Sequence, residues 1–565
     1  MSKYYCNPLN ISYKYQILEQ NGSLRMFREA ADPSLIFFKG QYFLFPSMSG
    51  GFWTSCDFVD WKFHEFINAM PVYDYAPDIQ VIGDYVYFCA SKNHGKCHFY
   101  RSKDPLTQPF EKIEGSFSFW DPALFYDDDG KLYLYWGCSN KEPIWGVQLD
   151  PETLRPTTRL KALISQAQDS FGHEYAWGKK PFIEGAWMTK YHDRYYLQYA
   201  SPGTEYPVYN DGVYTSAHPL GPFRPAKNNP FSYKPGGFIT GAGHGSTVKN
   251  HLKIRDDIFE GWWHISTMHI GCHHPSERRL GLWKAGFDSD GELFCDQRYG
   301  DWPTDLSAPA FSDPPWMLLS RGKHVSVSSG TGAPYVTDEN IRTWWRGDRP
   351  ADGTEAARKD PEWIQVDLGK IQDIRAIQVN FADQLTNIPK PDFWPSQSRF
   401  SKRYIDMTTG YIRWILEVSK DGNDYHILTD KSNAQTDLPH DLMIYGEGLW
   451  ARYIRLKILQ VPYGAKPCIS GLRIFGNGHG KLPEKVRGAQ AQRLDDLTLA
   501  VWWEPSRDGH EILWGYSPEK LYHSWTVYDV ASQEITALVK GEPVFVRVDT
   551  FNENGITHGD VIAVN

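Results

Sequence analysis

Four acidic residues stand at the same place in four similar segments of the chain. Asp32, Asp78, Asp121 and Glu184 each begin or adjoin an apolar run, which is followed by a tight turn and a second, aromatic-rich run; His244 holds this place in a fifth, looser copy. Any one of these acids alone could equally serve as a turn or cap residue. If all of them converge, they raise one another's pKa values, and carboxyl groups with separated pKa values perform acid–base chemistry.

The elements that would position these residues are hairpins. The turns that follow the apolar runs are Lys39-Gly40, Gly83-Asp84, Asp129-Gly130 and His192-Asp193. Successive copies lie 43 to 63 residues apart, at or above the period of four-stranded propeller repeats. Because the first strand of each propeller blade lines the central channel, residues at the same place in each copy would meet there. We therefore predict a five-bladed β-propeller over residues 1–319.

The repeat disappears after about residue 310. Alternating strand patterns such as Trp363-Ile-Gln-Val-Asp-Leu-Gly369 predict a β-sandwich over residues 320–477, and short strands predict a second, smaller one over 484–565. The glycine-rich stretch between them reads as a linker. The predicted fold class is thus all-β, a five-bladed β-propeller followed by two β-sandwich domains.

The composition and charge of the chain argue against two classes of function, nucleic-acid binding and membrane association. The 565 residues carry a net charge of -9, which gives no basic surface of the kind that nucleic acids require. No apolar run is long enough to span a membrane, and the first residues lack the pattern of a secretory signal, so we expect no membrane partner and a cytoplasmic protein. The eight cysteines have no zinc-type spacing and are expected to be reduced.

Several motifs carry a family resemblance. They are Ala31-Asp32-Pro33, Tyr75-Ala-Pro-Asp78, Asp121-Pro-Ala-Leu-Phe-Tyr and Ile183-Glu184-Gly185, in this order. Through them, residues 25–300 resemble glycoside hydrolase family 43, five-bladed propellers that cleave glycosidic bonds with inversion. The resemblance implies that Asp32 is the general base, Glu184 the general acid, and Asp121 the residue that modulates the pKa of the acid and orients it. Inversion needs the base and the acid on opposite faces of the sugar, roughly 6.5–9.5 Å apart.

The same resemblance implies further site residues. Asp78 and Arg278 are expected to bind substrate, and Trp53 is expected to stack on a sugar ring, with blade packing as its alternative. His244 falls where family members place a histidine beside a calcium ion held largely by water; a histidine satisfied within the core is the alternative. No cofactor is required for the chemistry.

The remaining regions resemble binding modules. Residues 320–477 are similar to discoidin-like (factor V/VIII type C) domains, with a long insertion from Thr386 to Thr409 that would change or cover their sugar-binding surface. Residues 484–565 are similar to fibronectin type III domains. The expected function is exo-hydrolysis that releases a terminal pentose from plant-type oligosaccharides or polysaccharide side chains, as an α-L-arabinofuranosidase or a β-D-xylosidase. The alternatives are an exo-β-1,3-galactan hydrolase, a subgroup that by resemblance lacks an aspartate at the position of Asp32, and a propeller that binds carbohydrate without cleaving it.

Overall fold

The computed structural model describes residues 3–92, 95–165, 181–254, 257–258, 261–384, 386–397 and 401–564. In these ranges the chain is almost entirely β-structure, with a single short α-helix, α1 (Glu355–Lys359). The predicted all-β class is confirmed. No helix among the described residues is long and apolar enough to cross a membrane.

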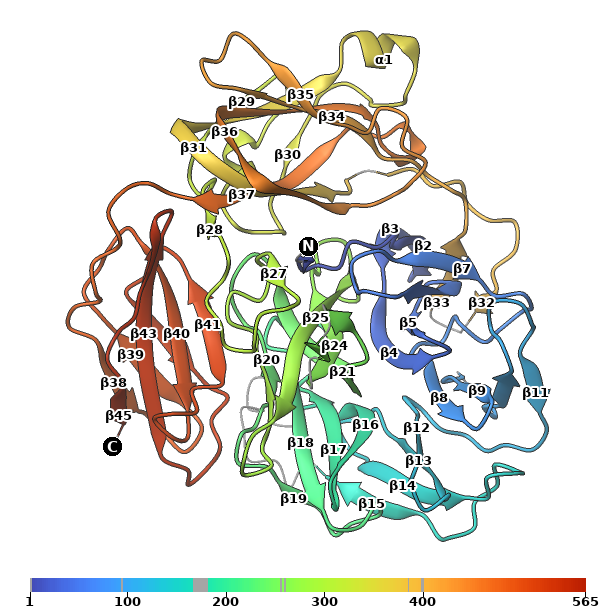
Figure 1. Cartoon of the computed structure of the whole chain (residues 1–565). Coiled ribbons are helices and arrows are strands. Elements are labelled where there is room, and N and C mark those ends of the chain that lie inside the picture. The colour runs from blue at the N-terminus through green and yellow to red at the C-terminus, as the bar shows by residue number, and fades with distance from the viewer. Residues whose placement is uncertain are drawn as a thin grey trace.

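Five sheets of the first half form the blades of a propeller (Figure 1). Their strands, from the innermost outward, are β4 (Ala31–Phe38), β5 (Gln41–Ser47), β6 (Gly51–Ser55) and β7 (Lys62–Glu65); β8 (Asp78–Ile82), β9 (Tyr85–Cys89), β10 (Phe99–Ser102) and β11 (Glu111–Ile113); β12 (Ala123–Tyr126), β13 (Leu132–Trp136), β14 (Ile144–Leu149) and β15 (Lys161–Ile164); β16 (Glu184–Tyr191), β17 (Arg194–Ser201), β18 (Asn210–Ser216) and β19 (Arg224–Pro225), with β20 (Ser232–Tyr233) also on β18; and β21 (Thr240–Lys249), β24 (Trp262–His269), β25 (Arg278–Phe287) and β26 (Leu293–Cys295). The five-bladed prediction is therefore confirmed.

The innermost strands close a ring. Each of β4, β8, β12 and β16 contacts the innermost strand of the next blade, and β21 contacts both β16 and β4. The hairpins have the predicted turn chemistry: Lys39 and Gly40 both have positive φ, 46° and 85°, as a type I′ turn between twisted strands requires. At the closure, the side chain of Asn7 bonds the backbone of Leu282 in β25, which ties the N-terminal segment to the last blade.

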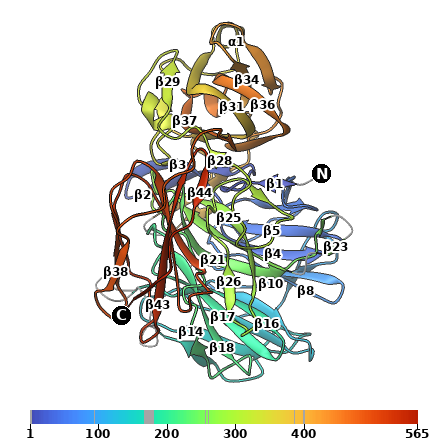
Figure 2. The same ribbon diagram turned by 60° about the vertical axis from the view of Figure 1, so that its left-hand side comes forward.

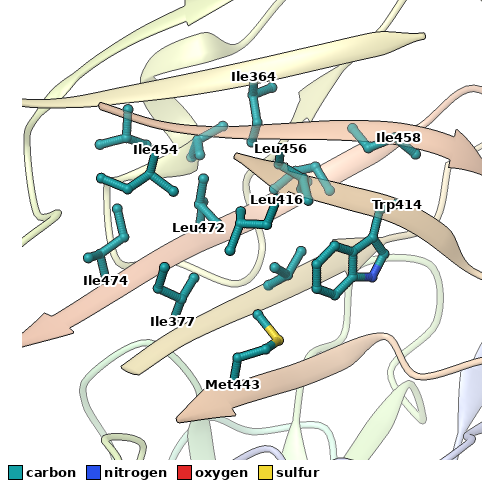
Figure 3. Packing of buried hydrophobic residues seen from close by; sticks show 14 of the residues in the cluster. Ile364, Ile377, Trp414, Leu416, Met443, Ile454, Leu456, Ile458, Leu472 and Ile474 are labelled. Carbon is teal, nitrogen blue, oxygen red and sulfur yellow. The ribbon is translucent and has the colours of Figure 1, made fainter. Parts of the chain in front are cut away.

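A β-sandwich lies above the propeller in Figures 1 and 2. Its strands are β28 (Met317–Leu318), β29 (His324–Val327), β30 (Trp345–Arg346), β31 (Glu362–Ala382), β34 (Arg413–Ser419), β35 (His426–Asp430), β36 (His440–Gln460) and β37 (Cys468–Asn477). Strands β31 and β36 pair along their length, and shifts of register beside Gln372 and Ala376 interrupt the ladder. Leu416, Ile454, Leu456 and Trp414 belong to the buried core between the strands (Figure 3).

The C-terminal residues form a smaller sandwich of two sheets beside the propeller (Figure 1). One sheet contains β38 (Gln490–Arg493), β39 (Leu499–Trp502) and β42 (Ser532–Ile535), and the other contains β40 (Gly509–Gly515), β41 (His523–Val527), β43 (Val544–Asn552), β44 (Gly555–Thr557) and β45 (Ile562–Val564). Tyr233 of the propeller packs edge-on against Trp514 and Trp525, so the core of this sandwich continues into the fourth blade.

A further four-stranded sheet joins the propeller to the first sandwich. It has the order β3 (Ser23–Glu29), β2 (Lys14–Gln20), β33 (Ser401–Asp406) and β32 (Ser396–Gln397). Strands β2 and β3 precede the first blade, whereas β32 and β33 come from the insertion expected between Thr386 and Thr409. The insertion therefore extends a sheet of the propeller region, and we call this element the shared sheet.

Candidate active site

The blade-start residues meet at one end of the propeller channel. Nδ1 of His244 lies 3.3 Å from Oδ1 of Asp32 and 3.8 Å from Oδ2 of Asp121. Ligand-type atoms of Asp121, Cys138 and Glu184 all lie within 4.8 Å of one another. The structure thus brings together Asp32, Asp121, Glu184 and His244, as their common place in the repeats predicts.

The backbone at these positions is unusual. Asp32, Asp121 and His244 have φ values of 48°, 49° and 52°, a left-handed conformation that non-glycine residues seldom adopt. Gly185, directly after Glu184, has a φ of 59°, and a Cβ atom on it would lie 2.6 Å from Cγ of His244. Glycine is therefore required after Glu184 for two reasons: the left-handed backbone conformation at position 185 and the close approach of the His244 ring. Such strain is retained where the surrounding structure fixes it, commonly at functional sites.

Asp32 is held as a carboxylate. Its side chain is buried, which by itself would raise its pKa, but the Arg278 guanidinium, His244 and a 2.7 Å hydrogen bond from Oγ of Ser47 together bring the pKa of Asp32 below its ordinary value. Nη1 of Arg278 lies 3.0 Å from Oδ1 of Asp32. An ionised aspartate of this kind is suited to accept a proton from water.

Asp121 has the opposite electrostatic environment. Burial, together with the neighbouring carboxyl groups of Glu184 and Asp32, raises its pKa to about 7, although His244 opposes the shift. Asp121 and Glu184 are close neighbours, since their carboxylate oxygens lie within 4.8 Å of each other. Near neutral pH, Asp121 therefore carries a proton part of the time.

Glu184 is held by two residues that the sequence analysis missed. Its Oε1 accepts a 2.6 Å hydrogen bond from Tyr209, and its Oε2 accepts a 3.0 Å contact from the thiol of Cys138. Cys138 follows β13 and Tyr209 immediately precedes β18, so neither stands at a blade start and no repeated motif marks it. Both donate hydrogen, which orients the carboxyl group from two sides.

His244 lies among acids. Burial would lower its pKa, but Asp32, Asp121, Glu184 and Asp211 raise it above its ordinary value. Calcium takes six to eight oxygen ligands. The metal-type cluster found in the described part of the chain consists of Asp121, Cys138 and Glu184 and does not include His244. A ring nitrogen and a thiol do not fit a directly coordinated calcium ion, so His244 would contact such an ion only through water, as the prediction has it.

Arg278 lies where a substrate-binding residue is expected, beside the base. Its side chain is 4% exposed and also contacts Oε1 of Glu29 at 2.6 Å and Oγ1 of Thr204 at 3.2 Å. Glu29 closes β3 of the shared sheet, so this sheet reaches the base through Arg278. Sequence reasoning did not single out Glu29, because it precedes the first repeated motif.

Asp78 and Trp53 lie elsewhere than predicted. Asp78 is 2% exposed and accepts hydrogen bonds from Oγ of Ser34 and the backbone N–H of Leu124, so its carboxyl group joins the first three blades. Trp53 is 1% exposed and packs on Phe63 within the first blade. The prediction that Trp53 stacks on a sugar is wrong, because neither face of its ring is accessible; blade packing was the correct alternative.

Comparison with known proteins finds a family similarity in the first half of the chain. Residues 26–259 match the model of glycosyl hydrolases family 43. The matched segment contains Asp32, Asp121, Glu184 and His244, and ends before Arg278. Two catalogued relatives are Xylosidase/arabinosidase 43A of Humicola insolens, 26% identical over 237 residues (35% of this chain, 64% of the relative), and Beta-xylosidase of Xylanibacter ruminicola, 28% identical over 151 residues (22% and 44%). The chain thus spans less than two thirds of the length of these relatives.

Solved structures are similar at low identity. A thermostable family-43 glycoside hydrolase is 23% identical with a TM-score of 0.41 and covers 55% of this chain and 98% of its own. The Bacteroides ovatus Xyloglucan PUL GH43B is 14% identical with a TM-score of 0.41, over 84% of this chain and 99% of its own.

Proposed function

We propose that this protein is an inverting glycoside hydrolase that releases a terminal pentose from oligosaccharides or polysaccharide side chains. The observation that carries the proposal is the electrostatic contrast between two buried aspartates at one channel end. Arg278, His244 and Ser47 lower the pKa of Asp32, while burial and neighbouring acids raise that of Asp121 to about 7. Asp32 is thus kept ionised as a base, and Asp121 is a carboxyl group that can hold a proton beside the proposed acid, Glu184.

In the proposed mechanism, Asp32 takes a proton from a water molecule that attacks the anomeric carbon. Glu184, oriented by Tyr209 and Cys138, gives its proton to the glycosidic oxygen of the leaving sugar. Asp121, whose own pKa burial raises to about 7, lies beside Glu184 and orients the acid, and solvent restores the protonation of the carboxyl groups after each turnover. Arg278 fixes the orientation of Asp32 through a charged hydrogen bond.

The names of the relatives indicate which two sugars the enzyme could release. One relative, from Humicola insolens, is named Xylosidase/arabinosidase 43A, and the other, from Xylanibacter ruminicola, is named Beta-xylosidase. We therefore propose α-L-arabinofuranosides and β-D-xylosides as substrates, whose choice depends on pocket shape. An exo-β-1,3-galactan hydrolase is disfavoured by Asp32, which is present and positioned beside Arg278. We further propose, from the sequence motifs alone, that the sandwiches are discoidin-like and fibronectin type III-like modules.

The decisive test combines aryl glycosides with variants of both carboxylates. The protein should release nitrophenol from the nitrophenyl α-L-arabinofuranoside or the nitrophenyl β-D-xyloside, but not from the nitrophenyl β-D-galactoside. Glu184→Ala should lose far more activity on a natural oligosaccharide than on the aryl substrate, because an aryl leaving group needs little acid assistance. Asp32→Ala should lose activity on both, and azide, which needs no deprotonation, should restore part of it.

Two further readouts separate the alternatives. Proton NMR of the first-formed sugar should show the anomer opposite to that of the substrate. Retention of configuration would contradict the assignment of Asp32 as base. Oligosaccharide binding without turnover in the wild type would favour the binding-protein alternative, and turnover of the galactoside alone would favour the galactanase.

A further inference from the structure

The shared sheet has two different faces. Its register pairs Gln16 with Ile405 and Leu18 with Arg403, and side chains alternate along each strand, so Gln16, Leu18 and Arg403 lie on one face. On this face, Gln16 bonds Glu29, which pairs with Arg278. This face is therefore turned toward the propeller channel.

The opposite face is turned toward the first sandwich. Arg28 lies there and is 1% exposed, with Nε 3.0 Å from Asp383 and Nη1 2.6 Å from Asp437. Tyr404, next to Arg403, packs with Ile388 and Ile17. Figures 1 and 2 show β2 and β3 between the propeller and this sandwich. The alternation of β33 thus places Tyr404 toward its own domain and Arg403 toward the channel.

Arg403 lies against the second-blade motif. Its guanidinium carbon is 4.2 Å from the centroid of the Tyr75 ring, and that of Arg278 is 5.1 Å from the same centroid. Tyr75 has a φ of 68°, so this loop is also held in a left-handed conformation. Nη1 of Arg403 points to Sδ of Met48 at 3.8 Å. Arg403 and Arg278 therefore share one aromatic ring beside the base.

The two arginines differ in their partners. Arg278 has carboxylate partners in Glu29 and Asp32 within 3.0 Å. Arg403 forms no ion pair with a carboxylate of the described residues, and its one hydrogen-bond acceptor among them is the weak thioether of Met48. Its side chain is partly exposed. A guanidinium has five N–H donors, so Arg403 keeps donors for an oxygen ligand while Tyr75 fixes its plane.

We propose that Arg403 donates a hydrogen bond to a hydroxyl oxygen of the terminal sugar, so that the sandwich insertion completes the substrate site of the propeller. This inference rests on the proposed function. The neighbours of Arg403 indicate that its ligand is the terminal sugar. The ring of Tyr75 contacts both Arg403 and Arg278, and Arg278 holds the base, Asp32. The matched segment ends before residue 403, so this contact would be a property of the combined chain.

The experiment compares Arg403→Ala and Arg403→Lys with Lys402→Ala. Lys402 is on the same strand but on the opposite face, where it pairs with Glu19 at the surface, and so provides the matched control. On the aryl pentoside that the wild type cleaves, Arg403→Ala should lower kcat/KM by about ten- to a hundredfold, the usual effect of losing a hydrogen bond from a charged group. Arg403→Lys should restore part of the loss, and Lys402→Ala should stay near the wild type.

Monodeoxy analogues of that pentoside identify the contact itself. For one of them, the wild type and Arg403→Ala should have similar kcat/KM values, because the hydroxyl group that Arg403 binds is already absent. A purely structural effect would instead lower kcat/KM by the same factor for every analogue, and this result would overturn the inference, as would an equal loss in Lys402→Ala.

Failure of the inference is distinguishable from failure of the proposed function. Wild-type turnover that Arg403→Ala leaves unchanged would refute the role of Arg403 alone. Absence of wild-type turnover on every substrate would refute the hydrolase, and calorimetric titration with arabino- and xylo-oligosaccharides would then test the contact. Weaker binding by Arg403→Ala than by Lys402→Ala would support it, and equal binding would overturn it. If Arg403→Ala does not fold, as judged by circular dichroism, Arg403→Lys and Arg403→Gln carry the same comparison.

Discussion

Replacing Asp78 by Asn should change how the stability of the propeller depends on pH. Asp78 joins three blades while it is 2% exposed, and burial raises its pKa from 3.8 to about 7 despite the hydrogen bonds from Leu124 and Ser34. The folded protein therefore binds this proton more tightly than the unfolded chain does. Stability contributed by this group is complete below pH 3.8 and falls as the pH rises toward 7.

The size of the effect follows from the two pKa values. One pKa unit corresponds to about 1.4 kcal/mol, so the ionised carboxylate costs about 4 kcal/mol once the pH exceeds 7. About 3 kcal/mol of this cost develops between pH 5 and pH 8. Asn has nearly the same shape and does not titrate. Asp78→Asn should therefore gain about 3 kcal/mol over the wild type between these two pH values, or about 6 °C in the melting temperature of a domain of this size.

Scanning calorimetry of both proteins at pH 5 and pH 8 would measure this difference. Asp84→Asn, in the exposed turn after β8, is the matched control and should show the same pH dependence as the wild type. The quantity compared is the change in the free energy of unfolding between pH 5 and pH 8. Any pH-independent loss of stability caused by the amide therefore cancels. Parallel pH dependence of Asp78→Asn and the wild type would refute the argument that burial raises the pKa of Asp78.

Three further predictions concern the site and its cysteines. Gly185→Ala should cost about 1–2 kcal/mol for its left-handed conformation and should lower kcat by displacing His244; unchanged kcat and melting temperature would contradict this. Asp121→Asn should move the alkaline limb of the pH–rate profile to lower pH, because a neutral amide, unlike an ionised carboxylate, does not disfavour loss of the proton from the neighbouring acid, and an immobile limb would count against the modulating role of Asp121. In the native protein a thiol reagent should label exposed Cys56 rapidly and without loss of activity. Cys138 is partly exposed, but burial and the neighbouring acids raise its pKa well above its ordinary value, so it should react far more slowly; labelling of Cys138 as fast as that of Cys56 would contradict this.

The sequence predicted those parts of the site that recur. Asp32, Asp121, Glu184 and His244 hold one place in successive hairpins, and a closed ring of blades necessarily brings such positions to one axis. The turn residues that mark the hairpins act locally, so they are visible in short stretches of sequence. For the same reason the all-β class and the number of blades could be predicted.

Single contacts between segments far apart in the sequence could not be predicted from the repeated motifs. Tyr209 and Cys138 reach Glu184 from strand ends that no motif repeats. Trp53 follows a glycine turn near the channel, but its strand places the ring inside the blade against Phe63. Arg403 belongs to an insertion whose pairing with β2 depends on the complete tertiary structure. Long-range pairing of this kind has no local signature.

The shared sheet makes the propeller inseparable from its neighbour. A chain that ended near residue 319 would leave β2 with an open edge, which invites association with other chains. It would also leave the buried Arg28 without Asp383 and Asp437, and breaking a buried ion pair in this way costs about 3–5 kcal/mol. The propeller and the first sandwich are expected to be inherited as one unit.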